Sequence, residues 1–348
     1  TDIEDKAIAE AEKEKVSIKE LTQRNADTFF ADAELLKIKS PTFNPRSSTT
    51  VDQAVELIKI LLEKGYAYWY KGNVYFDPLK FNEFGKLSKL DMSRWPKKKR
   101  RFHKDTYPGM PWNMGDFILW HGYKARDKVY WNTEIGKGRP AWNVQDGAMV
   151  TKDLGLVIDI ACGGIDNLAR HHDYTIAVVE GVSGKEFAHY WFHGTHLFVD
   201  GKKMSKSKGN VYYPKDLIKM GYKKEHIRFF LIYGHYRKRL NFTFKKLNET
   251  CQKLDTFNNM VDNLQKTKPA ESSEKAKKLV GRILESFERN MNNDLNVKAA
   301  FDDLFKVVLK LNTLRNQSKL GSEDARIAVA SLQRIDCVLQ ISFDLVSS

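Results

Sequence analysis

The stretch K-M-S-K-S-K-G-N at residues 203–210 indicates the fold of this chain more clearly than any other segment. It follows a predicted strand at 195–199 and a predicted Asp200-Gly201 turn, so its three lysines and two serines are expected on a loop at a strand end. Such a cationic loop suits contact with a polyphosphate, because ammonium groups stabilise phosphate charge. A solvated surface loop of the same composition is the alternative.

The composition predicts a protein of two or three domains with an anionic partner. The 348 residues include 58 Lys plus Arg against 44 Asp plus Glu, which gives a net charge of +14. Nucleic acid fits this excess better than a membrane does, because no apolar run approaches the ~20 residues of a spanning helix. A generally lysine-rich composition would give the same charge. The basic run at 97–101 is expected to be a solvated loop or a phosphate contact.

The few cysteines predict a cytoplasmic location. Cys162, Cys251 and Cys337 form no C-x-x-C pair, and no secretory leader precedes them, so a reducing compartment is expected. The sequence begins at Thr1 without an initiator methionine. We therefore expect a processed chain or one part of a longer protein.

The first two thirds of the chain mix helices with short strands. Residues 2–36 are predicted to be helical, an amphipathic helix ends at Gly65, and residues 67–76 form a β-hairpin. Short strands and glycine-rich turns dominate residues 117–199. The apolar run at 156–160 predicts a strand buried in a parallel sheet.

From about Leu247 the pattern changes to helices alone. Apolar residues recur at helical spacing in four successive segments, which predicts a four-helix bundle. Cys251 and Cys337 lie in these segments and are predicted to be buried as small hydrophobic side chains. The four apolar stripes are Leu247, Cys251, Leu254, Val261 and Leu264; Leu279, Ile283 and Phe287; Leu304, Val308 and Leu311; and Leu332, Ile335 and Leu339.

A second motif, G-I-D-N-L-A-R-H at 164–171, follows the predicted strand through a Gly163-Gly164 turn. Glycines at a strand end let a nucleotide approach the backbone, and a carboxylate just beyond can accept hydrogen bonds from ribose hydroxyls. Asp166 is the residue placed for that role. Taken alone, the segment would equally fit a tight turn capped by an aspartate.

These motifs resemble those of class I aminoacyl-tRNA synthetases. The K-M-S-K-S string is similar to the loop that closes on the ATP triphosphate in that class, and G-x-D-x-x-x-x-H is similar to a pattern of one subset. Six further segments recur in the same order in cysteinyl-tRNA synthetases, so the resemblance covers essentially the whole chain. They are T-D-I-E-D-K at 1–6, D-F-I-L-W at 116–120, G-R-P-A-W at 138–142, H-H at 171–172, G-H-Y-R at 234–237 and M-N-N-D-L-N at 291–296.

The resemblance implies an α/β, Rossmann-like class I synthetase catalytic domain with a connective insertion, followed by an all-α helical bundle. It places the remainder of a first Rossmann half at 1–40, the insertion at 41–130, and the second half with both motifs at 131–246. The bundle at 247–348 would bind tRNA. The family's H-I-G-H motif lies upstream of the position that matches Thr1 and does not occur here, so the catalytic domain is expected to be incomplete at its N-terminus. The chain alone is therefore expected to activate an amino acid poorly or not at all.

The resemblance also implies roles for individual residues, with ATP and Mg²⁺ as cofactors. Lys203 and Lys206 match catalytic lysines that bind the phosphates. The ATP-binding positions are Gly164, Asp166, His171, Met204, Ser205 and Ser207, and the amino-acid pocket is Thr1, Trp142, Asp146, Ala161 and Thr175.

The departures from the family concern its zinc ion, which binds the substrate thiolate through Cys, His and Glu ligands. His171 keeps its place, whereas the Cys and Glu positions are Asp146 and Thr175, and a pocket histidine is replaced by Ala161. Threonine is a poor zinc ligand. A weakened Zn²⁺ site is therefore expected, with His171 and Asp146 as its remaining ligands in this sequence. The resemblance places one further zinc Cys of the family upstream of the position that matches Thr1.

Three functions follow from these observations. The first is a cysteinyl-tRNA synthetase-like ligase that uses ATP to activate an amino acid, cysteine by family, and transfers it to tRNA. The second is a paralogue in which Asp146 and Gln145 recognise a polar or cationic amino acid, or another acceptor. The third is a non-catalytic tRNA-binding descendant, which the retained nucleotide motifs disfavour.

Overall fold

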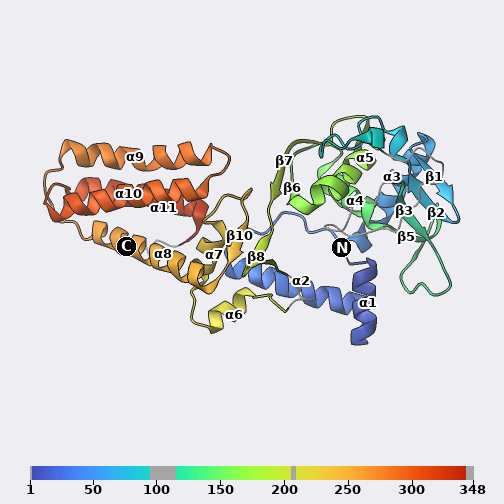
Figure 1. The fold of residues 1–348 in the computed structure, drawn as a ribbon, viewed down its shortest axis with the longest axis horizontal. Helices are drawn as coiled ribbons and strands as arrows, with labels where there is room; N and C mark the ends of the chain where they lie inside the picture. Colours follow the sequence, from blue (N-terminus) through green and yellow to red (C-terminus); the bar gives the residue numbers. More distant parts are fainter. Residues whose placement is uncertain (1, 95–114, 205–208, 342–348) are drawn as a thin grey trace. The chain divides into compact units, whose positions relative to one another are not determined.

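The computed structural model describes residues 2–94, 115–204 and 209–341. The chain divides into two units: unit 1 contains residues 1–29 and 41–194, and unit 2 contains residues 30–40 and 195–348 (Figure 1). The predicted basic run at 97–101 lies outside the described residues. The four-segment division made from the sequence is a different partition and stays a prediction.

Unit 1 is built around a sheet with the order β1-β2-β3-β5-β4, in which neighbouring strands are antiparallel. The predicted hairpin is confirmed, because β1 and β2 pair from Ala67↔Phe76 to Tyr70↔Asn73. Helices α3, α4 and α5 contribute Leu57, Val144 and Val178 to the core beneath it. The elements are α1 (Asp5–Glu14), α2 (Ile18–Leu35), α3 (Val51–Glu63), β1 (Ala67–Tyr70), β2 (Asn73–Phe76), β3 (Phe117–Gly122), β4 (Trp131–Thr133), β5 (Gly136–Pro140), α4 (Trp142–Leu154) and α5 (Asp173–Ser183). The last six residues of α2, 30–35, belong to unit 2.

A parallel pair of strands carries the second motif of the sequence. Strand β6 (Ile158–Gly164) runs into α5 through two short helical turns, and β7 (Ala188–Gly194) returns beside it. The prediction of a buried strand was half right: the pairing is parallel, but Ile160 is 54% exposed. Ala161 and Trp191 pack in an apolar cluster with Ile176 and Val179 of α5, whereas Ile160 and its cross-strand neighbour Tyr190 are exposed.

Unit 2 begins with a sheet of order β10-β8-β9, formed by β8 (Leu197–Val199), β9 (Lys202–Lys203) and β10 (Leu240–Phe242). Asp200 and Gly201 join β8 to β9 with φ values of 48° and 75°. Positive φ at both central residues is the geometry of a two-residue hairpin, which confirms the predicted turn. Helices α6 (Pro214–Lys219) and α7 (Lys224–Ile232) follow.

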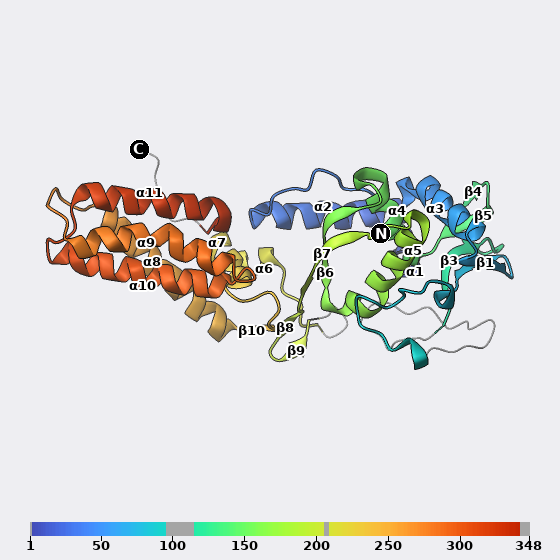
Figure 2. The same cartoon turned by 90° about the horizontal axis from the view of Figure 1, so that it is seen from above.

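Four long helices complete the described part of unit 2 and confirm the predicted bundle (Figure 2). They are α8 (Phe244–Gln265), α9 (Glu274–Met291), α10 (Val297–Asn316) and α11 (Ser322–Leu339). Their apolar stripes form one core, in which Leu254, Ile283 and Leu304 are buried. Cys251 is buried as predicted, but Cys337 is exposed. Cys337 lies two residues beyond Ile335, which turns it away from the buried stripe of α11.

No helix in the described part of the chain has both the length and the apolar composition needed to cross a bilayer.

Candidate active site

The end of strand β6 holds two glycines against polar side chains. A Cβ added at Gly163 would lie 2.5 Å from Cε1 of His172, and one added at Gly164 would lie 2.7 Å from Oδ1 of Asp166. Any larger residue would displace these side chains, which explains the glycine pair. Asp166 and His172 therefore lie directly over the backbone at the carboxyl end of a parallel strand, where nucleotides bind in α/β folds.

His172 joins an aromatic cluster at the ends of the two parallel strands. Its Nδ1 lies 2.7 Å from Nε2 of His193, so one ring nitrogen donates its proton to the other. Trp191 lies beside both rings, with centroids 4.9 Å from His172 and 5.9 Å from His193. Burial, and then the charges of His171 and His193, lower the pKa of His172 to about 4. His172 is therefore neutral at physiological pH.

Several residues predicted for the amino-acid pocket or its metal lie close together, on α4, on the turn before α5 and on α5 itself. Trp142 stacks on His171 with ring centroids 4.5 Å apart, and Asp146, one turn further along α4, accepts a hydrogen bond from Nε2 of His171. The hydroxyl of Thr175 donates to the backbone oxygen of His171 at 2.9 Å. Trp142, Asp146 and Thr175 thus all contact His171.

Asp146 is the exposed charge of this cluster. Burial opposes its ionisation, but the charge and hydrogen bond of His171 outweigh that effect, so the pKa of Asp146 lies below its ordinary value. Its side chain is 44% exposed, whereas that of His171 is 8% exposed. The carboxylate of Asp146 is therefore more accessible to solvent than the imidazole of His171.

The donors in this cluster do not fit the zinc ion of the family. His171 and Asp146 are the two adjacent donors, and the hydroxyl of Thr175 is a poor zinc ligand. Among the residues that the structure describes, no group of three or more His, Cys, Asp or Glu side chains could hold a metal ion. A structural zinc site needs four ligands and a catalytic one needs three, so His171 and Asp146 by themselves fall short of both.

The remaining predicted residue of the pocket, Ala161, lies apart from the polar cluster. It belongs to a small apolar core with Ile176 and Val179 of α5. Thr1, also predicted for the pocket, lies outside the described residues.

The lysine-rich motif belongs to unit 2. Lys203 is the last residue of β9, and its Nζ lies 3.3 Å from Nε2 of His196. Met204 lines an apolar cavity of about 190 Å³ together with Leu197 and Phe230. The predicted site residues Ser205, Lys206 and Ser207 lie outside the described residues.

The sequence motifs predict no role for His172, His193 and Trp191. The H-H pair at 171–172 is a segment of the family resemblance, and no motif covers W-F-H at 191–193. Strand pairing brings His193 opposite Gly163, and this juxtaposition across 30 residues depends on the β6–β7 register.

Comparisons with known proteins agree with this geometry. A family model described as the tRNA synthetases class I (C) catalytic domain matches residues 1–252. A cysteine–tRNA ligase from Chlamydia pneumoniae is 38% identical over 98% of this chain and 72% of its own length. A cysteine–tRNA ligase from Brachyspira hyodysenteriae is 36% identical over 93% of this chain and 69% of its own length.

Solved structures support the fold. A Mycobacterium tuberculosis methionyl-tRNA synthetase in complex with methionyl-adenylate superposes with a TM-score of 0.62 at 15% identity, over 97% of this chain and 80% of that one. The predicted Rossmann-like class I catalytic fold is thereby confirmed. The chain belongs to the cysteinyl-tRNA synthetase family of class I aminoacyl-tRNA synthetases.

Proposed function

We propose that the protein is an aminoacyl-tRNA synthetase that activates cysteine with ATP and transfers it to tRNA. The amino-acid carboxylate attacks the α-phosphate of ATP, forming an aminoacyl-adenylate and releasing pyrophosphate, and the 3′ end of tRNA then accepts the aminoacyl group. The observation that carries this proposal is the placement of Asp166 and His172 over two glycines at the carboxyl end of β6. Class I synthetases use ATP with Mg²⁺, and the family match extends over 98% of the chain.

Residues of each motif are assigned a role in ATP binding. Asp166 accepts hydrogen bonds from the ribose hydroxyls, and the absence of a side chain at Gly164 lets the nucleotide approach the backbone. Lys203 and Lys206 stabilise the charge that develops on the leaving pyrophosphate, with Met204, Ser205 and Ser207 completing their loop.

The amino-acid site is assigned to the cluster around His171. Trp142 forms a wall by stacking on the imidazole, and Thr175 fixes the backbone of His171 from the next turn. The imidazole orients Asp146, whose ionised carboxylate faces the ligand. Hydrogen bonds from a substrate ammonium group to this carboxylate would be charge-assisted.

Substrate choice is tested by ATP–pyrophosphate exchange with full-length protein and a panel of amino acids. Exchange with cysteine alone supports the proposal. The exposed charge of Asp146 favours one alternative substrate, a polar or cationic amino acid. Pyrophosphate exchange with such an amino acid, and not with cysteine, would establish this alternative. A full-length protein that binds tRNA but exchanges with no amino acid would be a non-catalytic descendant.

We further propose that cysteine selection here does not use the family's zinc ion. His171 and Asp146 supply two donors, and loss of thiolate and carboxylate ligands lowers zinc affinity. Metal analysis of the purified full-length protein should find less than one zinc ion per chain, and exchange should survive a strong chelator. Stoichiometric zinc that is lost in His171→Ala would contradict this.

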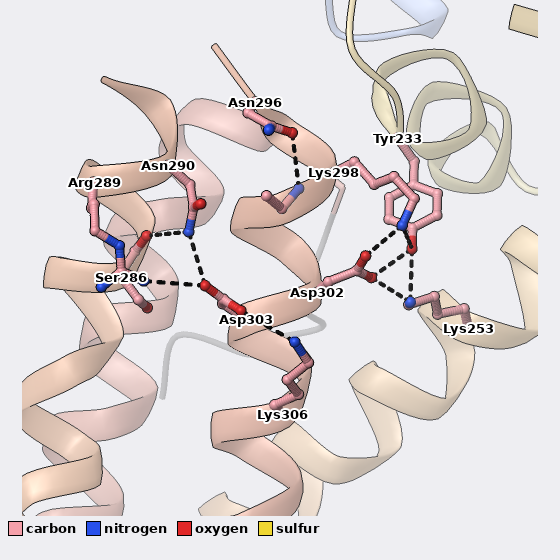
Figure 3. A network of polar contacts seen from close by, with 11 residues as sticks. Tyr233, Lys253, Ser286, Arg289, Asn290, Asn296, Lys298, Asp302, Asp303 and Lys306 are labelled. Atoms are coloured by element: carbon pink, nitrogen blue, oxygen red, sulfur yellow. Dashed lines mark hydrogen bonds and ion pairs between the residues drawn. The ribbon is translucent and has the colours of Figure 1, made fainter. Parts of the chain in front are cut away.

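The tRNA surface is assigned to a groove between α9 and α10. Arg282, Arg289, Lys306 and Lys310 line a hollow of about 90 Å³. Asp303 pairs with Arg289 at 3.2 Å and with Lys306 at 3.4 Å (Figure 3). Arg282 and Lys310 have no carboxylate partner among the described residues, so they are available to phosphates of a nucleic-acid backbone.

The groove is tested by tRNA binding as a function of salt. The double variant Arg282→Gln/Lys310→Gln should weaken binding and lower the salt slope by about one for each contact removed. The double variant Lys277→Gln/Arg326→Gln is the matched control, because it also removes two positive charges but from ion pairs, Lys277 with Glu274 at 3.0 Å and Arg326 with Glu323 at 2.7 Å. Equal losses of tRNA affinity in the two variants would show that net charge alone is responsible and would refute the assignment of the tRNA surface to this groove.

A further inference from the structure

Two motifs that the proposed function leaves without a role meet in unit 2. They are G-H-Y-R at 234–237, which follows α7, and M-N-N-D-L-N at 291–296, which joins α9 to α10. The carboxylate of Asp294 accepts hydrogen bonds from the hydroxyl of Tyr236 at 2.7 Å and from Nε of Arg237 at 2.7 Å. Nε2 of His235 lies 3.6 Å from the same carboxylate. One carboxylate therefore engages three consecutive residues of the other motif.

The turn that presents Asp294 is conformationally unusual. Asp294 and Leu295 have φ values of 56° and 53°, so two successive residues that are not glycine adopt the left-handed conformation. Side chains with a Cβ occupy this conformation at an energetic cost, and it persists only where the surroundings hold it. The turn is held by hydrogen bonds from the Leu295 amide to Met291 and from the Asn296 amide to Asn290. This turn holds the side chain of Asp294 where it meets Tyr236 and Arg237.

A second carboxylate holds the other end of the same segment. The hydroxyl of Tyr233 donates to Asp302 of α10 at 2.6 Å. Lys253 of α8 and Lys298 of α10 also donate to Asp302, which closes a four-residue cluster (Figure 3). The α9–α10 hairpin thus fixes the chain at Tyr233 and again at Tyr236 and Arg237.

The fixed segment is in contact with the strands that carry Lys203. The amide of Thr195 donates to the backbone oxygen of Tyr236 at 2.9 Å, and the Thr195 hydroxyl donates to that of Lys238 at 2.7 Å. Two residues later, β8 pairs in parallel with β10, and the guanidinium of Arg239 lies 4.0 Å from the ring centroid of Phe198. Phe198 is the cross-strand partner of Lys203. Contacts therefore run without a break from Asp294 to the first lysine of the K-M-S-K-S motif.

We propose that Asp294 is a positioning residue for Lys203, the first lysine of the K-M-S-K-S motif. By holding Tyr236 and Arg237, it fixes segment 236–239 against the start of β8 and so sets the position of the strand pair that ends in Lys203. A tRNA seated on the α9–α10 hairpin would be linked to Lys203 through the same contacts. The expected effect on ATP use rests on the proposed function, whereas the contact path from Asp294 to Lys203 does not.

The test compares Asp294→Asn with wild type in the full-length protein. The amide removes the charge but keeps the shape, and Tyr236→Phe is a second variant that removes one hydroxyl. Glu323→Gln is the matched control, because it removes a carboxylate from an exposed ion pair with Arg326 on α11. Amide hydrogen exchange in peptides covering 195–204 and 236–242 should become about threefold to tenfold faster in Asp294→Asn. Peptides from α11 should be unchanged.

Pyrophosphate exchange supplies the functional measurement. Asp294→Asn should raise the KM for ATP while the KM for the amino acid stays constant, and Glu323→Gln should alter neither. Unchanged hydrogen exchange at 195–204 would overturn the inference. Faster hydrogen exchange throughout unit 2 with an unaltered KM for ATP would also overturn it, because Asp294 would then act only in the stability of the unit. If wild type shows no pyrophosphate exchange, the proposed function fails, and hydrogen exchange alone then decides the contact path.

Discussion

Replacement of Asp302 by asparagine should destabilise unit 2, because its carboxylate is the centre of the cluster that joins α7, α8 and α10. Burial alone would raise the pKa of Asp302, but hydrogen bonds from Lys253, Lys298 and Tyr233 lower it from 3.8 to about 2. The side chain is 23% exposed, so solvent screens these interactions only in part. A shift of this size corresponds to about 2 kcal/mol of stabilisation for the charged form.

The direction of the pKa shift of Asp302 sets the pH range in which its carboxylate stabilises the fold. A carboxyl group whose pKa is depressed in the folded state stabilises the fold fully above its unfolded pKa of 3.8. The contribution is lost as the pH falls through the folded pKa of about 2. Asp302→Asn should therefore lose about 2 kcal/mol at neutral pH, and the variant should show a flatter stability profile over the acidic interval.

Hydrogen exchange in peptides from α8 and α10 is the suitable assay. All seven tryptophans precede residue 195, so their fluorescence reports on unit 1 rather than on the bundle. Glu323→Gln is again the control, because exposed ion pairs contribute at most about 1 kcal/mol. If Asp302→Asn lost no more than the control, or kept the wild-type slope with pH, the assigned coupling would be refuted.

Three other predictions concern the site and the cysteines. Gly163→Ala should destabilise unit 1 by about 1–3 kcal/mol in tryptophan-monitored unfolding, because the new methyl would lie 2.5 Å from His172. Gly194→Ala, which has open space around its Cβ, should be close to wild type in stability. Equal losses of stability in the two variants would contradict the packing argument. Lys206→Ala should abolish pyrophosphate exchange while barely changing tRNA affinity, and a parallel loss of both would assign this lysine to RNA binding instead. Thiol labelling should be fast at Cys162 and Cys337 and slow at Cys251. Burial, and then the charge of Asp255, raise the pKa of the Cys251 thiol to about 11. Equal labelling rates at all three thiols would show that the surroundings of Cys251 open readily.

Local patterns in the sequence predicted much of the fold. The stripes of α8–α11 follow from helical spacing, and the Asp200-Gly201 hairpin follows from the positive φ that such a turn requires. The exposure of Cys337 shows the limit of these patterns, because a residue near an apolar stripe can still face solvent. Ile160 shows the same limit for a strand, since burial depends on which faces of the sheet are covered.

Contacts between distant segments could not be predicted in this way. The gathering of Trp142, Asp146 and His171 around one imidazole was expected from the family resemblance, and spacing alone would not have identified it. The His172–His193 pair depends on strand register, and the contact between Asp294 and Arg237 joins residues 57 apart in the chain. Both segments of that contact were recognised as family motifs, but only the folded structure brings them together.

ATP–pyrophosphate exchange with cysteine is the most direct measurement of the central claim. Full-length protein supplied with cysteine, ATP and Mg²⁺ should incorporate labelled pyrophosphate into ATP, and Asp166→Ala should remove this activity while leaving tRNA binding intact. Absence of exchange with cysteine and with every other amino acid, in protein that still binds tRNA, would contradict the account.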